Sequence, residues 1–242
     1  MQFIETLGIV FRNIKYSETS VIVDIYTEQC GLRSFIVSGV RSPRATIKAS
    51  LLQVMSLVEL IAPNRNDTTL HRLKELRMAH TYQSLPFNVA KGAVGLFMAE
   101  LARKTIKEEE PNPELFEFVW RSFTYLDSTG APFGNVHLWF MASLSGFLGF
   151  MPHGDWSEKT PFLDLKTGIF VADAPTHTLY MDEESSQLLQ LLLHTELEQS
   201  ATIKMNRTQR QILLEKMLTF YSLHIENLSP LQSHKILQEI ME

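Results

Sequence analysis

Six basic residues within the first fifty positions are the side chains of this sequence best suited to bind a polyanion. They are Arg12, Lys15, Arg33, Arg41, Arg44 and Lys48. The last three fall in one short segment, GVRSPRATIK, at residues 39–48. Binding of single-stranded nucleic acid requires cations spaced along a groove, where they meet phosphates. The spacing fits this chemistry, and it fits an ordinary solvated turn equally well.

Such a groove also needs flat side chains on which bases can stack. Tyr16, Tyr26 and Phe35 lie in the same region and are candidates. Aromatic residues in strands more often belong to the core, so each of the three is also a candidate core residue.

Other kinds of chemistry find little support in the sequence. It contains no G-x-S-x-G, no phosphate-binding loop and no G-x-G-x-x-G, so no enzyme class is indicated. Cys30 is the single cysteine, which excludes an internal disulfide and a multi-cysteine zinc site. His153, Asp155, Asp173 and His177 are metal-ligating types near one another, but their spacing matches no zinc template, and solvated loop residues are the plainer interpretation.

The segments that carry or flank these cations have the sequence patterns of β-strands. Residues 4–14, 20–28, 32–39 and 54–62 are short, rich in Val, Ile and Phe, and partly alternating. Residues 69–81 are a fifth strand or a short helix. Five short antiparallel strands within residues 1–80 suit a small barrel, which leaves no exposed sheet edge.

The remainder of the chain, residues 81–242, is mostly helical in pattern. Apolar residues recur three and four apart, Pro111 ends the first helix, and Asp182 and Asn206 are candidate caps. Residues 151–181 are rich in Pro and Gly, and we expect a small irregular insertion there with one strand, GIFVAD. The predicted class is therefore α+β, a β-barrel followed by a helical domain.

Charge and composition are those of a globular protein with an uneven charge distribution. Residues 1–80 hold 10 Lys+Arg against 7 Asp+Glu (+3), and the rest holds 12 against 20 (−8), which sums to the net −5. No secretory signal or membrane-spanning stretch is recognisable, so we expect a cytoplasmic protein without a membrane partner.

A set of motifs, in order along the chain, resembles the RecO family. They are YSETSVIV at 16–23, TEQCG at 27–31, GVRSPR at 39–44, LLQ at 51–53, AELARKTIKEEEPNPELFEFV at 99–119 and FLGFMP at 147–152. The resemblance covers most of the chain.

The resemblance implies an N-terminal OB-fold at 1–80 and a helical domain at 81–242 in which 151–181 is a zinc-finger-like insertion. It implies a DNA-repair role without catalysis: binding of single- and double-stranded DNA, annealing of complementary strands, and binding of RecR and of the acidic C-terminal tail of SSB, which together help to load RecA. The matching DNA-contacting positions are the six cations listed first.

The sequence departs from the family pattern in the insertion, where many RecO proteins carry four cysteines and this chain has none. We therefore expect no zinc and no other cofactor, with Trp156, Phe162 and Phe170 holding the insertion instead. For the SSB tail, the candidate residues are Arg103, Lys104, Lys107 and Arg121, although cations near a helix C-terminus also complement the helix dipole. The alternative function is a protein–protein adaptor of the repair machinery whose barrel binds no DNA.

Overall fold

The computed structural model describes residues 3–40, 45–63 and 70–240. The chain forms two compact units, one of residues 1–87 and 99–127, the other of residues 88–98 and 128–242. This division differs from the boundary expected near residue 80, and the functional domain limits stay a prediction. The expected cations at positions 41 and 44 lie outside the described residues.

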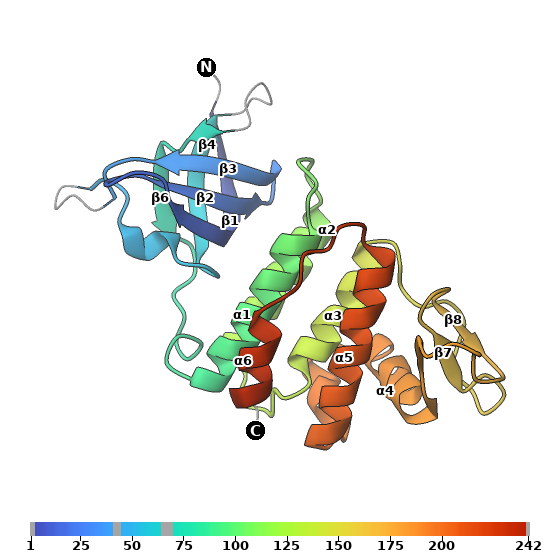
Figure 1. The fold of residues 1–242 in the computed structure, drawn as a ribbon. Helices are drawn as coiled ribbons and strands as arrows, with labels where there is room; N and C mark the ends of the chain where they lie inside the picture. Colours follow the sequence, from blue (N-terminus) through green and yellow to red (C-terminus); the bar gives the residue numbers. More distant parts are fainter. Residues whose placement is uncertain (1–2, 41–44, 64–69, 241–242) are drawn as a thin grey trace. The chain divides into compact units, whose positions relative to one another are not determined.

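The N-terminal strands form one curled, OB-like sheet (Figure 1), which confirms the expected α+β class. Its strand order is β5-β3-β2-β1-β4-β6. The strands are β1 (Phe3–Lys15), β2 (Val21–Thr27), β3 (Gly31–Val37), β4 (Leu57–Pro63), β5 (His71–Arg72) and β6 (Glu75–Met78), with a 3-10 turn η1 (Ala49–Leu52) before β4. The segment expected to be a strand or a helix is thus two short strands.

Alternation along the strands builds the barrel core. Val23 and Ile25 of β2, Phe35 of β3 and Leu60 of β4 point inward and are almost fully buried. Successive side chains of a strand point to opposite faces, so the residues between them face outward. The apolar runs of the sequence therefore decide which side of each strand is left for function.

A β-bulge in β1 changes which of its side chains face outward. Val10 pairs with Ile25, but Arg12 pairs with Asp24, so Phe11 is the extra residue. Val10 belongs to the core, and strict alternation would point Arg12 inward as well. The bulge shifts the alternation by one, which places Arg12 on the outer face and Asn13 on the inner one.

Two helices and their connector complete the first unit. Helix α1 (Val89–Thr105) enters it with its C-terminal half, and α2 (Pro113–Ser128) belongs to it almost entirely. Asp127 accepts hydrogen bonds from the backbone N–H groups of Gln83, Ser84 and Leu85. These bonds hold the pKa of Asp127 below its usual range despite the opposing effect of burial, and they fix the segment that leaves the barrel.

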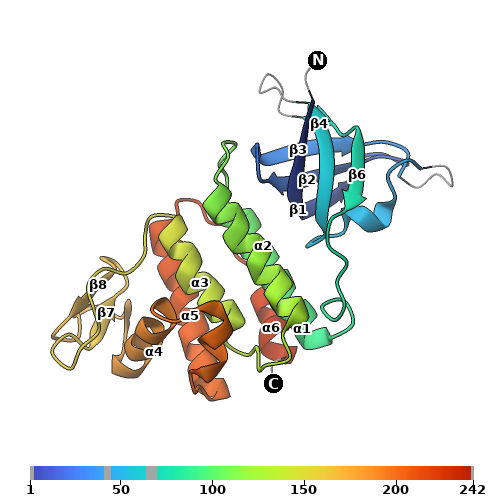
Figure 2. The same ribbon diagram turned by 180° about the vertical axis from the view of Figure 1, so that it is seen from behind.

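The second unit contains α3 (Val136–Phe147), α4 (Glu183–Leu193), α5 (Arg207–His224), α6 (Ser233–Ile240) and a 3-10 turn η2 (Leu197–Thr202). Helices α3, α4 and α5 lie side by side in both views (Figures 1 and 2). The expected caps are confirmed: Asp182 accepts from the Ser185 N–H, and Asn206 forms a capping box with Gln209. Among the described residues, no helix combines the length and apolar character needed to cross a membrane.

The insertion is more regular than expected. The predicted strand is β8 (Ile169–Val171), and it pairs with β7 (Phe162–Asp164), which also pairs with β9 (Tyr180–Met181). Phe170 is buried, and the His224 ring of α5 is hydrogen bonded to the Leu165 carbonyl. Apolar packing and this hydrogen bond hold the insertion against the helices of the second unit.

Candidate nucleic-acid interface and a cationic pocket

Arg12 lies on the outer face of the sheet in a row with Asp24 and Ser34. Its Nε donates to Asp24 Oδ2 at 2.5 Å, and the Ser34 hydroxyl donates to Asp24 Oδ1 at 2.7 Å. The Arg12 side chain remains 39% exposed, against 11% for Asp24. The carboxylate therefore fixes the guanidinium at the surface and leaves part of the Arg12 side chain accessible to solvent.

Lys15 and Lys48 belong to segments that meet at the end of the barrel that carries the β1–β2 hairpin. Asn13 Nδ2 donates to the Leu52 carbonyl at 2.9 Å, which joins the end of β1 to the segment after Lys48. The Val40 N–H donates to the Thr19 carbonyl at 3.1 Å, which adds the end of β3 to the same place. Both lysines are exposed. We call this the hairpin end of the barrel.

Arg33 is placed differently from the other described cations. It pairs with the core residue Ile25 and so belongs to the inward-facing row of β3. Its guanidinium donates to the carbonyls of Cys30 at 2.9 Å and Glu109 at 3.2 Å. The structure thus ties Arg33 to the α1–α2 connector at the opposite end of the strand, and does not group it with Arg12, Lys15 or Lys48.

The connector, residues 106–112, closes that opposite end, which we call the connector end. The Leu32 N–H donates to the Glu108 carbonyl at 2.9 Å. Gly31 has a φ of +66°, and a Cβ there would lie 2.5 Å from the Glu110 carbonyl oxygen. Only glycine permits both this backbone conformation and this approach.

The three candidate stacking residues also separate. Tyr26 and Phe35 are each 1% exposed. Phe35 belongs to the barrel core, whereas Tyr26 lies on the other face of the sheet, where it stacks on Phe11 with ring centroids 5.6 Å apart and packs against Phe116 of α2. Burial raises the pKa of Tyr26 well above its usual value. Tyr16, at the hairpin end, is 60% exposed and is the one of the three that remains available to a base.

A row of isoleucines next to Arg12 escaped the sequence reasoning. The register aligns Ile14 with Ile22 and Ile22 with Ile36, and Ile36 pairs with Arg72 of β5. The row could have been found only by knowing the bulge, because the shifted alternation is what turns Ile14 outward.

The other half of the outer face is acidic. Arg77 of β6 donates to both carboxylate oxygens of Glu59, at 2.7 and 2.6 Å, and to Glu5 at 3.1 Å. The hydrogen bonds from Arg77 lower the pKa of Glu59. Because carboxylates already surround Arg77, this half of the outer face is not suited to bind phosphates.

The cations expected to receive an acidic tail belong to α1, its connector and α2. Lys104 forms an ion pair with Glu100 at 2.8 Å, and its side chain is only 9% exposed. Lys107 and Arg121 are exposed, and Arg103 is half-buried. Lys104 is thus committed within its own helix, while the other three remain candidates.

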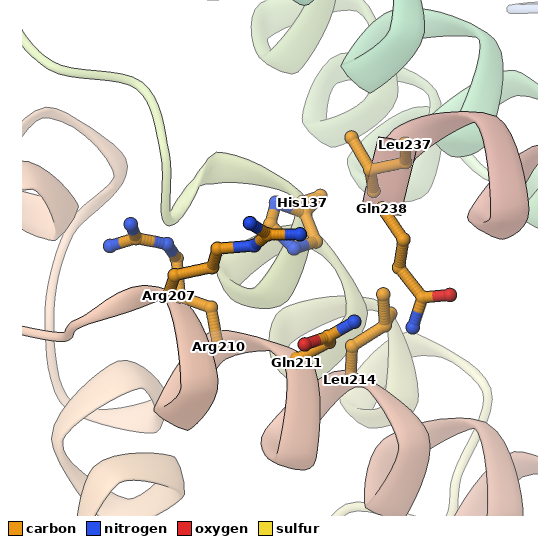
Figure 3. Close-up of a pocket in the computed structure, with 7 residues that line it drawn as sticks. All are labelled: His137, Arg207, Arg210, Gln211, Leu214, Leu237 and Gln238. Atoms are coloured by element: carbon orange, nitrogen blue, oxygen red, sulfur yellow. The ribbon is translucent and has the colours of Figure 1, made fainter. Parts of the chain in front are cut away.

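A pocket in the second unit combines two guanidinium groups with apolar walls (Figure 3). It is lined by Arg207 and Arg210 of α5 and by the ring of His137 from α3, and Leu214 and Leu237 supply apolar surface. Arg210 Nη1 is anchored by the Met205 carbonyl at 2.6 Å.

His137 is neutral at physiological pH. It is 3% exposed, and burial, with a smaller contribution from Arg210, lowers its pKa to about 3. Its Nδ1 is buried without a hydrogen-bond partner. Because the His137 imidazole is neutral, the charge of the pocket is that of the two arginines and is positive. The pocket therefore suits a carboxylate that carries an apolar group.

The candidate metal ligands of the insertion do not form one cluster. His177 lies 3.4 Å from Asp164, whereas Asp155 accepts a hydrogen bond from Gln190. In the described part of the chain, no group of three or more His, Cys, Asp or Glu side chains is arranged to hold a metal ion. Together with the lack of cysteines in the insertion, these residues do not fit a zinc finger.

Comparison with known proteins settles the relationship. The family described as "Recombination protein O N terminal" matches residues 1–82, and "Recombination protein O C terminal" matches residues 87–234. The chain belongs to the RecO family. Members of this family named "DNA repair protein RecO" include those of Bacteroides fragilis (36% identity over 240 residues, 98% of this chain and 99% of the relative) and Christiangramia forsetii (35% over 238 residues, 98% of each). A third, from Phocaeicola vulgatus, is 33% identical over 236 residues, again 98% of each chain.

Proposed function

We propose that this RecO-family DNA repair protein is a recombination mediator. It binds single- and double-stranded DNA, anneals complementary strands, and helps RecR to load RecA onto DNA coated with SSB. The observation that carries the proposal is the hairpin end, where Lys15 and Lys48 are exposed on joined segments, together with Arg12, which Asp24 holds on the outer face of the same strand β1. Family membership supports the repair role.

The physical basis is neutralisation of phosphates rather than catalysis. Each phosphate that a cation neutralises on a single strand releases counterions and adds about 0.7 to the slope of log affinity against log salt. Two strands held by one cationic surface, or by two copies of it, repel each other less, and annealing follows. No covalent step, metal or cofactor is required.

The test is annealing of complementary oligonucleotides coated with SSB. We expect the wild-type protein to accelerate annealing, and a variant with Lys15, Arg41, Arg44 and Lys48 changed to Ala to lose most of that effect. Lys159→Ala with Lys166→Ala, on the exposed surface of the insertion, serves as the control for lost charge. Full annealing by the quadruple variant would contradict the proposal.

The adaptor alternative makes the opposite prediction for DNA itself. If the barrel binds no DNA, a labelled oligonucleotide will not shift in electrophoresis at about 50 mM salt, where electrostatic binding is strong, and RecR binding will be unaffected by the four substitutions. A shift that disappears at about 200 mM salt supports the mediator function instead.

The acidic SSB tail requires a second site, and the pocket of Figure 3 suits it better than the α1 cations. Two guanidinium groups can bind a terminal carboxylate, and Leu214 and Leu237 can receive an apolar side chain. Among the α1 cations, the charge of Lys104 is compensated by Glu100. We therefore place the tail between α5 and α6.

Titration of an SSB tail peptide distinguishes the two placements. We expect Arg207→Ala and Arg210→Ala each to weaken peptide binding about tenfold or more, as loss of a charge-assisted hydrogen bond does. Arg103→Ala and Arg121→Ala should leave it unchanged. Loss of binding in the second pair alone would return the tail to α1 and α2.

A further inference from the structure

The outer face of the barrel carries an apolar row that phosphate binding does not use. Ile14, Ile22 and Ile36 are aligned across β1, β2 and β3. Neighbouring strands are about 4.8 Å apart, so the row spans roughly 10 Å, about the width of a base with its sugar. Ile14 is 41% exposed, and Ile22 and Ile36 are half-buried.

These side chains point away from the barrel interior. The residues on either side of Ile22 are Val21 and Val23, and both are buried in the core. Phe35 and Val37 do the same on either side of Ile36. The row is therefore a surface feature whose contact with water is unfavourable.

Cations and an aromatic ring surround this row. Arg12 lies one row away on β1, and Arg72 stands at the end of the row on β5. Tyr16, the residue that follows β1, is exposed. Asp24, a carboxylate in the neighbouring row, is paired with Arg12 and accepts a hydrogen bond from Ser34. An apolar strip between positive charges is complementary to a polymer with apolar faces and a negative backbone.

We infer that Ile14, Ile22 and Ile36, with Tyr16, form the surface on which the bases of a single strand lie, and that they make binding selective for unstacked DNA. In a duplex the base faces are covered by stacking and only the backbone reaches the cations. In a single strand they are free to contact an apolar surface. This inference rests on the proposed DNA binding and adds to it the choice between the two DNA forms.

The experiment compares a single-stranded oligonucleotide with a hairpin duplex of equal phosphate number. We expect Ile22→Thr with Ile36→Thr to weaken single-strand binding about fivefold to tenfold, which is the lower end of the loss known for removal of one base–aromatic stack. Duplex affinity should change less than about twofold, and the salt slope should stay the same because no phosphate contact is lost.

The matched control is Ile61→Thr. Ile61 pairs with Glu5 and Glu75 on the acidic half of the same outer face, and it is half-buried like Ile22 and Ile36. This variant should bind both DNA forms as the wild type does. Thermal unfolding of all variants checks that the sheet is intact, and crosslinking from a strand containing 5-iododeoxyuridine should map to Tyr16.

The outcomes separate the two proposals. An equal loss on both DNA forms, or no loss on either, overturns the base-contact surface and leaves DNA binding standing. A wild-type protein that binds neither form overturns the proposed function itself. If the double variant changes only the self-association of the protein, measured by sedimentation, the row is an interface between copies and the inference is wrong.

Discussion

The two ends of the barrel treat their cations in opposite ways. At the hairpin end, Lys15 and Lys48 are exposed, and hydrogen bonds from the Asn13 side chain and the Val40 backbone join the segments around them. At the connector end, Arg33 is bound by main-chain carbonyls, and the chain beside it carries Glu108, Glu109 and Glu110. Basic side chains thus supply binding capacity at one end and stabilise the fold at the other. What decides is whether a backbone acceptor lies within reach.

Of the substitutions that test this difference between the two ends, Gly31→Val should have the largest effect. A side chain there meets the connector backbone, and the residue must keep a left-handed conformation, so we expect a loss of about 3 kcal/mol in unfolding free energy. Urea unfolding measures it. Gly39→Val is the matched control, because Gly39 has a φ of +71° but nothing within 4 Å of an added Cβ. It should lose only about 1 kcal/mol. Equal losses would mean that the connector yields freely and does not close the barrel.

Lys15→Ala with Lys48→Ala tests the hairpin end. We expect single-strand affinity to fall roughly tenfold at low salt and the salt slope to fall by about 1.4, since two phosphate contacts are removed. Stability should change little because both side chains are exposed. Lys107→Ala, at the connector end, should change neither affinity nor slope. If it lowers affinity as much as the pair does, DNA follows the whole barrel and the ends do not differ.

Arg33→Ala sharpens the comparison because sequence and structure predict different results. A DNA-contacting arginine would lower affinity and salt slope. The observed bonds to Cys30 and Glu109 instead predict a loss of about 1 kcal/mol in stability, with DNA affinity within about twofold of wild type. Urea unfolding and oligonucleotide titration of one preparation measure both. A lower salt slope at unchanged stability would mean that Arg33 contacts DNA after all.

Much of the fold follows from local sequence patterns, because the forces that set it are local. Alternation marks the strands, and a side-chain oxygen at Asp182 or Asn206 caps a helix through bonds three residues away. The family motifs likewise identified the barrel and the helical region. Such signals depend on neighbours in the chain and can be seen without coordinates.

The candidate site could be predicted only in part, because it depends on contacts between distant residues. The bulge at Phe11, which turns Arg12 and Ile14 outward, is a matter of pairing register. The position of Arg33 depends on its hydrogen bond to the carbonyl of Glu109, which lies 76 residues further along the chain. The pocket of Figure 3 joins α3, α5 and α6 through side chains that carry no motif. Residue types gave the list of cations, and the fold determines which of them are available.

Tyr26→Phe should have the smallest effect at the connector end. Its hydroxyl donates to the Asn112 carbonyl at 3.5 Å, a length at which a hydrogen bond contributes little. The ring, stacked on Phe11 and packed on Phe116, is retained. We expect a change of less than about 0.5 kcal/mol in unfolding free energy. Tyr82→Phe is the comparison, because that hydroxyl donates to the Met55 carbonyl at 2.8 Å and its loss should cost about 1 kcal/mol. If Tyr26→Phe costs as much as Tyr82→Phe, then polar contacts of the connector, and not ring packing with the Gly31 approach, hold that end closed.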